Sequence, residues 1–115
     1  MLKLAKAGNE KDTDTELGNG QTTRSFTVNH GIAVFSLVGN FSAQTVTLQM
    51  SPGGMNGNFA TYVAKDTSGV PASATYTDDC SDCVYGHGQT FRFVCSAGGS
   101  PDIDIFVSGD GVILN

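Results

Sequence analysis

The sequence predicts an all-β domain, a β-sandwich or jelly roll of about seven or eight short antiparallel strands with an extended N-terminal arm. The first reason is composition: Gly, Thr, Ser and Asn supply 44 of the 115 residues, and charged residues supply only 15%, where soluble domains average ~25%. The second reason is a period-2 alternation of apolar and polar residues in short runs, which turn residues separate. No ten-residue segment shows a helical period. A chain of this length buries a single core.

The chain divides into a predicted arm, residues 1–23, and a predicted sandwich domain, residues 24–115. The arm is polar and without period, so we expect it to stay apart from the core. About 20 extended residues reach ~65 Å, enough to cross a neighbouring subunit. Leu2 and Leu4 are the predicted anchor on such a partner, and a terminus without a role is the alternative.

The domain opens with a predicted hairpin. Phe26 and Val28 alternate with polar residues, a His-Gly pair supplies a turn, and residues 32–38 form the next strand. That run is apolar on both faces, which is typical of a central strand covered on both sides. We expect the cover to come from the sandwich or from a subunit contact, with Phe35 and Leu37 as contact candidates.

Residues 44–50 carry the cleanest alternation, with Val46, Leu48 and Met50 on one face. Residues 51–58 combine Pro, Gly and Asn into a turn that joins this strand to an antiparallel partner at residues 59–64. A weaker strand is predicted at residues 72–77.

The last third of the sequence contains a predicted acidic loop and three predicted strands. The loop covers residues 78–88, and the strands cover residues 90–95, 102–107 and 112–114. Asp102 and Asp104 are expected on the outward face of an edge strand, where charge hinders edge-to-edge association. The residues expected to face the core are Phe91, Phe93, Cys95, Ile103, Ile105 and Val107.

Three cysteines and a histidine form the only motif with obvious chemistry. Cys80, Cys83, His87 and Cys95 are a permissible tetrahedral zinc set. However, Cys95 alternates with phenylalanines as a small apolar residue does, so we expect no metal. A Cys80–Cys83 disulfide, a bridge from one of these to Cys95, and free thiols all remain open. No helix follows the C-x-x-C pair, which excludes a thioredoxin-like site.

Other functional classes are disfavoured. Six basic against 11 acidic residues give a net charge of −5, so the basic stripe needed for nucleic acid is missing. No apolar run approaches the ~20 residues that span a bilayer, and no secretion signal is visible. His30 and His87 lie near no nucleophile motif. Asp78, Asp79 and Asp82 lack EF-hand spacing and are expected to be solvated. We therefore expect neither an enzyme nor a cofactor.

One segment resembles a known family. Residues 45–59, T-V-T-L-Q-M-S-P-G-G-M-N-G-N-F, resemble a strand–turn–strand segment of small β-sandwich virion proteins of tailed bacteriophages. Residues 37–45 are similar to the turn that precedes it, and residues 102–107 are similar in character to a closing strand. The sequence differs in lacking the aspartate after Pro52 and in having Phe59 where Trp is usual.

The resemblance implies a capsid decoration or cement protein that is made in the host cytoplasm and binds the outside of the assembled head. It implies the major capsid protein as partner, a homotrimer and no catalysis. Leu2, Leu4, Phe35 and Leu37 are then the candidate capsid or subunit contacts. The alternative is a tail-fibre or host-glycan recognition module that exposes Tyr62, Tyr76 or Tyr85.

Overall fold

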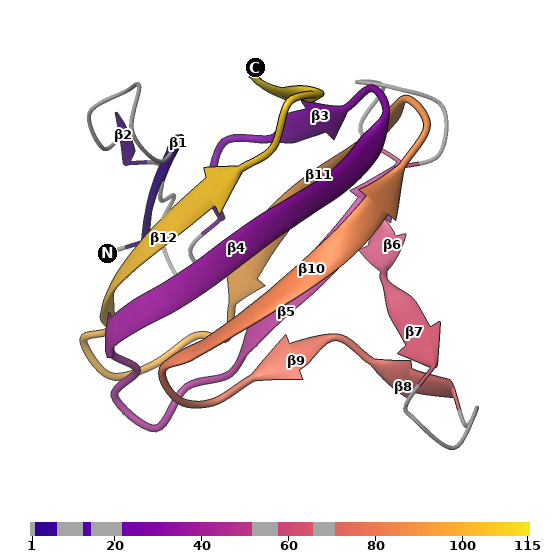
Figure 1. Cartoon of the computed structure of the whole chain (residues 1–115). Helices are drawn as coiled ribbons and strands as arrows, with labels where there is room; N and C mark the ends of the chain where they lie inside the picture. The colour runs from indigo at the N-terminus through magenta and orange to yellow at the C-terminus, as the bar shows by residue number, and fades with distance from the viewer. Residues whose placement is uncertain (1, 7–12, 15–21, 52–57, 66–70) are drawn as a thin grey trace.

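The computed structural model describes residues 2–6, 13–14, 22–51, 58–65 and 71–115, and this part of the chain consists of strands and their connections (Figure 1). No helix in the described residues is long and apolar enough to cross a membrane. The strands are β1 (Leu2–Lys6), β2 (Thr13–Asp14), β3 (Phe26–Val28), β4 (Gly31–Asn40), β5 (Val46–Ser51), β6 (Ala60–Thr61), β7 (Val63–Lys65), β8 (Pro71–Ser73), β9 (Thr75–Tyr76), β10 (Cys80–Gly86), β11 (Gln89–Cys95), β12 (Asp102–Ser108) and β13 (Val112–Leu114).

Two sheets form the layers of a β-sandwich. Sheet A has the order β10-β4-β12-β1-β2, and sheet B has the order β13-β3-β11-β5-β6, with β9 also pairing with β5. The short ribbon β7-β8 belongs to neither sheet. The pairings within the two sheets are antiparallel except for β1 with β12, which is parallel. The predicted all-β sandwich is confirmed.

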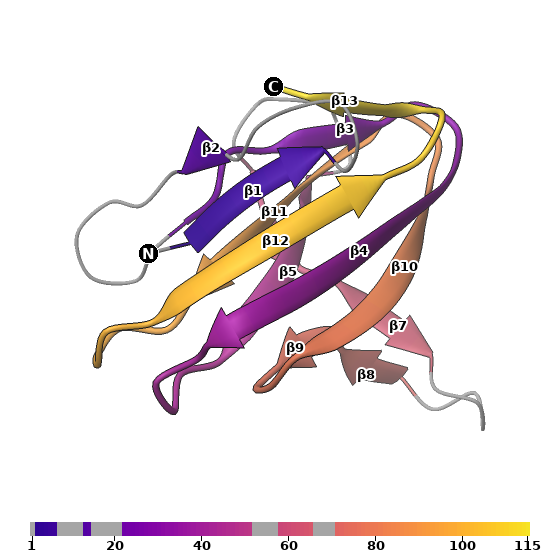
Figure 2. The ribbon, with the colours of Figure 1, turned by 60° about the vertical axis from the view of Figure 1, so that its left-hand side comes forward.

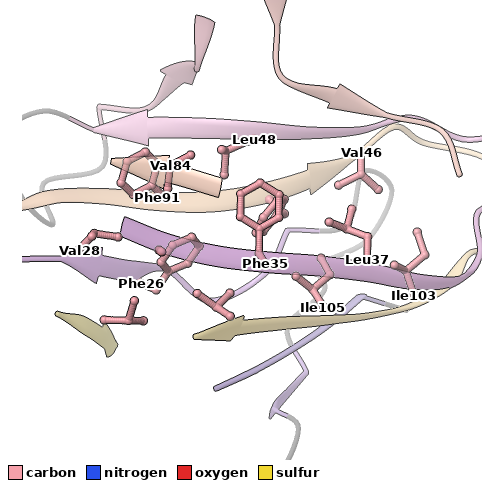
Figure 3. Packing of buried hydrophobic residues seen from close by; sticks show 14 of the residues in the cluster. Phe26, Val28, Phe35, Leu37, Val46, Leu48, Val84, Phe91, Ile103 and Ile105 are labelled. Atoms are coloured by element: carbon pink, nitrogen blue, oxygen red, sulfur yellow. The ribbon is translucent and has the colours of Figure 1, made fainter. Parts of the chain in front are cut away.

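The core lies between the sheets and is rich in phenylalanine (Figure 3). Phe35 of sheet A meets Phe93 of sheet B edge-to-face, with ring centroids 5.1 Å apart. Phe26 stacks on Phe91 and Phe93 within sheet B. Such aromatic pairs add about 0.5–1.5 kcal/mol each beyond the area they bury. The rings therefore fix how the two layers meet.

The alternation predicted from sequence is confirmed in three strands. Each of β5, β11 and β12 sends every second side chain into the core, as the period of a strand requires. Met50, at the end of its row, is only partly buried. The fully or almost fully buried members are Val46, Leu48, Phe91, Phe93, Cys95, Ile103, Ile105 and Val107.

The predicted hairpin of residues 26–38 is wrong. β3 pairs with β11 and β13 in sheet B, whereas β4 lies in sheet A between β10 and β12. Gly31, with φ of 77°, opens β4 just after the bend at His30. A non-glycine residue adopts that backbone conformation at a cost. The chain thus changes layer at a position that also resembles a hairpin turn.

The predicted loop at residues 78–88 is also wrong, because most of it is strand β10. All seven residues from Cys80 to Gly86 pair with β4. Only Val84 and Gly86 are buried there, so the sequence shows no apolar period. Backbone pairing with a long neighbour forms this strand despite its polar side chains.

The expectation that the arm stays apart from the domain needs correction at both ends. β1 lies beside β12 with five residues in register, from Leu2 opposite Ile103 to Lys6 opposite Val107 (Figure 2). Thr22 forms a β-bridge with Val94 of sheet B. β12 lies between β4 and β1 in sheet A. It is therefore not the edge strand that Asp102 and Asp104 led us to expect.

Candidate functional site

The outward side of sheet A is unusually apolar at its centre. Along β4, Phe35 points into the core, whereas Val34 and Ser36, on either side of it, face outward. Ile32, Val34 and Val38 are 45%, 49% and 48% exposed. A half-exposed row of β-branched side chains is what remains when a strand is apolar on both faces and only one face is covered.

The neighbouring strands extend this surface. In register with β4, Tyr85 of β10 pairs with Ile32, and Phe106 of β12 pairs with Ser36. Among the described residues, five of the seven large hydrophobic side chains that are exposed lie here. We call this surface the outer face, and it is made of Ser81, Cys83 and Tyr85 of β10, Ile32, Val34, Ser36 and Val38 of β4, and Asp104, Phe106 and Ser108 of β12.

The two ends of the outer face differ in chemistry. At one end the ring of Tyr85, 64% exposed, stacks against His87 with centroids 6.2 Å apart and planes at 28°. At the other end Asp104 lies opposite Val38, and Asp102 lies opposite Asn40. The centre, around Val34 and Ser36, carries no charged side chain. The face is therefore an apolar strip with aromatic and acidic ends.

The candidate Cys80–Cys83 disulfide is not formed, and the strand geometry forbids it. Both thiols are free. Three residues along a strand separate the Cα atoms by about 10 Å, whereas a disulfide needs less than ~7 Å. Cys80 also packs against the core while Cys83 is exposed, so the two side chains leave β10 on opposite sides.

The four candidate zinc ligands are not brought together either. Cys83 is exposed on sheet A, while Cys95 is fully buried in sheet B. The described residues contain no group of three His, Cys, Asp or Glu side chains that could hold a metal ion. Burial raises the pKa of the Cys95 thiol. Burial, reinforced by the charge of Asp82, likewise raises the pKa of Cys80, so both thiols resist forming the thiolate that binds metal or attacks a substrate.

The three aspartates that lack EF-hand spacing, Asp78, Asp79 and Asp82, are exposed and take part in local hydrogen bonds. Asp79 Oδ1 accepts from the backbone N–H of Gly39 at 3.0 Å, and Asp78 Oδ1 accepts from the N–H of Asp79 at 2.8 Å. The hydroxyl of Tyr76 donates to Asp82 Oδ2 at 2.9 Å. Burial and this hydrogen bond raise the pKa of Tyr76 well above its ordinary range. These contacts hold the start of β10 in place.

The predicted contact residues of β4 lie on the face that packs into the core, so this prediction is wrong. Phe35 and Leu37 are 1% and 0% exposed, so both belong to the core and neither can touch a partner. The residues that can are their outward neighbours, above all Val34. The sequence shows that β4 is apolar on both faces, which indicated a possible contact surface. Which of the two faces points outward could not be determined without knowing how β4 pairs with its neighbours.

The remaining candidates lie in different environments. Leu2 and Leu4 occupy register positions opposite Ile103 and Ile105, and their side chains lie outside the described structure. Tyr62 and Tyr76 pack against the core, edge-to-face with Phe91 and Phe35. Tyr85 alone of the three tyrosines stands on the outer face.

The comparisons with known proteins give little beyond the fold. No family model matches the sequence, and no curated protein matches it. Among solved structures, a family 35 carbohydrate-binding module from an environmental isolate is similar, with a TM-score of 0.44 and 21% sequence identity over 96% of this chain and 82% of that chain. This similarity concerns the β-sandwich architecture alone.

Proposed function

We propose that this chain is a non-catalytic structural module that decorates a phage capsid, docking through the outer face of sheet A and through its N-terminal segment. The observation that carries the proposal is the concentration of exposed apolar side chains on that one face. A contiguous apolar patch rimmed by polar groups marks a surface that another protein covers. Scattered exposed hydrophobic residues would carry no such meaning.

The chemistry of the described side chains supports a binding role over catalysis. The thiols of Cys80 and Cys95 are held in the protonated form by burial. Asp79 and Asp82 are engaged in hydrogen bonds that secure β10. General acid–base or nucleophilic catalysis needs such groups free and close to a reacting atom.

The partner and place follow from the resemblance of residues 45–59 to small virion proteins. The partner we propose is the major capsid protein on the outside of the head, with further copies of this chain beside it. β5 and β6, which flank the Gly-rich part of that segment, are paired antiparallel, which is compatible with the resemblance. Many copies on a regular lattice gain avidity from simultaneous contacts, so each contact can be weak.

Co-sedimentation of the full chain with empty capsids of the source phage tests this proposal. We expect saturable binding at a fixed number of copies per capsomer. Val34→Asp, which puts a charge at the centre of the outer face, should lose binding. Ile113→Asp is the matched control, because Ile113 is 51% exposed on sheet B and Val34 is 49% exposed. Failure of the unmodified chain to bind capsids at any concentration would refute the proposal.

Host-glycan recognition is the second candidate function. The exposed ring of Tyr85, stacked on His87 at one end of the outer face, favours it, because an aromatic face can stack on a sugar ring. A glycan array probed with the labelled chain tests this alternative. Binding that Tyr85→Ala abolishes, without affinity for capsids, would replace the decoration role.

A further inference from the structure

One edge of sheet A is long and open. β10, with seven residues, is the last strand of the sheet, and β4 is its neighbour on one side (Figure 1). No strand of the described chain pairs with its other side. The other strands at the margins of the two sheets, β2, β6, β9 and β13, are two or three residues long. Short edge strands offer little for another chain to pair with, whereas a long one is a template for strand addition.

The hydrogen bond of Cys83 shows which backbone groups of β10 face the open side. In an antiparallel pair, only alternate residues exchange hydrogen bonds with the neighbouring strand. The N–H of Cys83 donates to Asp82 Oδ1 at 2.8 Å, so Cys83 belongs to the alternate set that faces away from β4. By the same alternation, Ser81 and Tyr85 face the open side as well. An added strand would use the backbone groups of these three residues.

Asp82 lies across this open side. It stands between Cys80 and Val84, which both pack inward, so the alternation directs its side chain toward sheet B. Its Oδ2 accepts a hydrogen bond from the hydroxyl of Tyr76 on β9 at 2.9 Å, while its Oδ1 accepts from the N–H of Cys83. Both oxygens of the carboxylate are therefore held, and a charged group occupies the central donor of the edge.

A strand that paired with β10 would have to displace this carboxylate. Its carbonyl group would need the N–H of Cys83, which Asp82 holds. Its backbone would also cover the carboxylate of Asp82, which is exposed in the single chain, and covering an unpaired charge is costly. Proteins use inward-pointing charges on edge strands to prevent edge-to-edge pairing.

We propose that Asp82 holds the edge of β10 closed against strand addition, so that the intact chain stays unpaired there. Without Asp82, the edge should pair with its own copy, β10 antiparallel to β10, because a strand edge is complementary to itself across a twofold axis. This inference goes beyond the proposed function and does not depend on it, since it concerns the edge of the sheet and not the outer face. It assigns to Asp82 the protective role that the sequence suggested for Asp102 and Asp104.

Sedimentation velocity of the full chain from about 1 µM to 1 mM tests the inference. Salt of about 0.3 M screens the repulsion between negatively charged copies, and a reducing agent prevents a disulfide through the exposed Cys83. The unmodified chain should stay a single copy, and Asp82→Ala should rise in mass toward two copies. Asp110→Ala is the matched control, because Asp110 is also exposed and its loss changes the net charge equally. It should behave as the unmodified chain does.

A second substitution shows whether the association runs along β10. Cys83→Pro removes the N–H that faces the open side, and proline is tolerated on an edge strand in that orientation. Combined with Asp82→Ala, it should return the chain to a single copy. Circular dichroism checks that each variant stays folded.

Hydrogen exchange gives an independent reading of the same edge. In Asp82→Ala the amides of Cys83 and Tyr85 should exchange at least tenfold more slowly at about 1 mM than at about 1 µM, because pairing protects them. Asp82→Ala that stays a single copy at 1 mM would overturn the inference. So would equal association of Asp82→Ala with Asp110→Ala or with the unmodified chain. Association that leaves the amides of Cys83 and Tyr85 unprotected would also overturn it, because the contact would then lie elsewhere.

Discussion

Gly86 shows how closely the two sheets approach at one end of the sandwich. It lies at the end of β10 and faces inward, toward Val28 of β3. A Cβ atom at this position would lie 2.3 Å from the Cβ of Val28 and 2.6 Å from its carbonyl oxygen. Because backbone as well as side chain stands in the way, a rotamer change cannot make room. Glycine is required here by packing between the layers.

Gly86→Ala should therefore destabilise the fold by about 1–3 kcal/mol, the usual cost of overpacking a core. Urea unfolding followed by circular dichroism measures the change. Ser81→Ala, an exposed position on the same strand, is the control and should stay within about 0.5 kcal/mol of the unmodified chain. An alanine at position 86 that costs no more than this control would show that the layers are not in contact there.

At the scale of elements, β1 is a peripheral strand on a sheet that closes without it. β12 pairs with β4 over seven residues independently of β1. Thr23 fastens the start of the domain, because its N–H donates to the carbonyl of Phe93 and its Oγ1 accepts from the N–H of Phe93.

Deleting residues 1–21 should leave the domain folded but expose one edge of β12. We expect the β12 amides that face β1 to exchange with solvent at least tenfold faster, while amides of β11 keep their protection. Hydrogen exchange read by mass spectrometry distinguishes the two strands. Unchanged exchange along β12 would argue that β1 is not held there in solution, and loss of protection throughout would make β1 part of the core.

Which elements the sequence could predict depends on how their side chains are shared between core and solvent. β5, β11 and β12 alternate strictly, so their inward residues could be identified from the period alone. β10 could not, because Val84 is its only large buried side chain and the aspartates at and just before its start are typical of a loop. The place of β1 was equally hidden, since its partner lies about 100 residues away along the chain and no local signal specifies it. The outer face could not be located from the sequence for a similar reason. β4 is apolar on both sides, and only its pairing with other strands shows which side packs into the core.

At the scale of the whole molecule, three groups whose pKa values are raised in the folded chain should make the fold less stable at alkaline pH. The pKa of Tyr76 is raised by burial and by Asp82, and the pKa values of Cys80 and Cys95 are raised by burial. The ordinary values of these groups are 10.0 for tyrosine and 9.0 for cysteine. Above them the unfolded chain releases protons that the folded chain retains, so the free energy of unfolding falls as pH rises.

We expect a melting temperature that begins to fall near pH 9 and falls more steeply above pH 10. Differential scanning calorimetry between pH 7 and pH 11, in steps of about half a unit, measures this dependence. Tyr76→Phe should cost about 0.5–1.5 kcal/mol at neutral pH through the lost hydrogen bond and should flatten the alkaline part of the curve. A flat melting temperature up to pH 11, or an identical slope in the variant, would contradict this assignment.

The interleaved strand order also governs when the protein can fold during its synthesis. β4 lies in the first third of the chain, but its neighbours β10 and β12 are synthesised later. β3 likewise has no paired neighbour until β11 and β13 have been synthesised. Such distant pairings make folding slow, because long loops must close before any contact rewards them. On the ribosome, a nascent chain that ends before residue 89 cannot complete either layer. The phenylalanines of such a nascent chain remain exposed to solvent and to chaperones until most of the residues up to β13 have been translated.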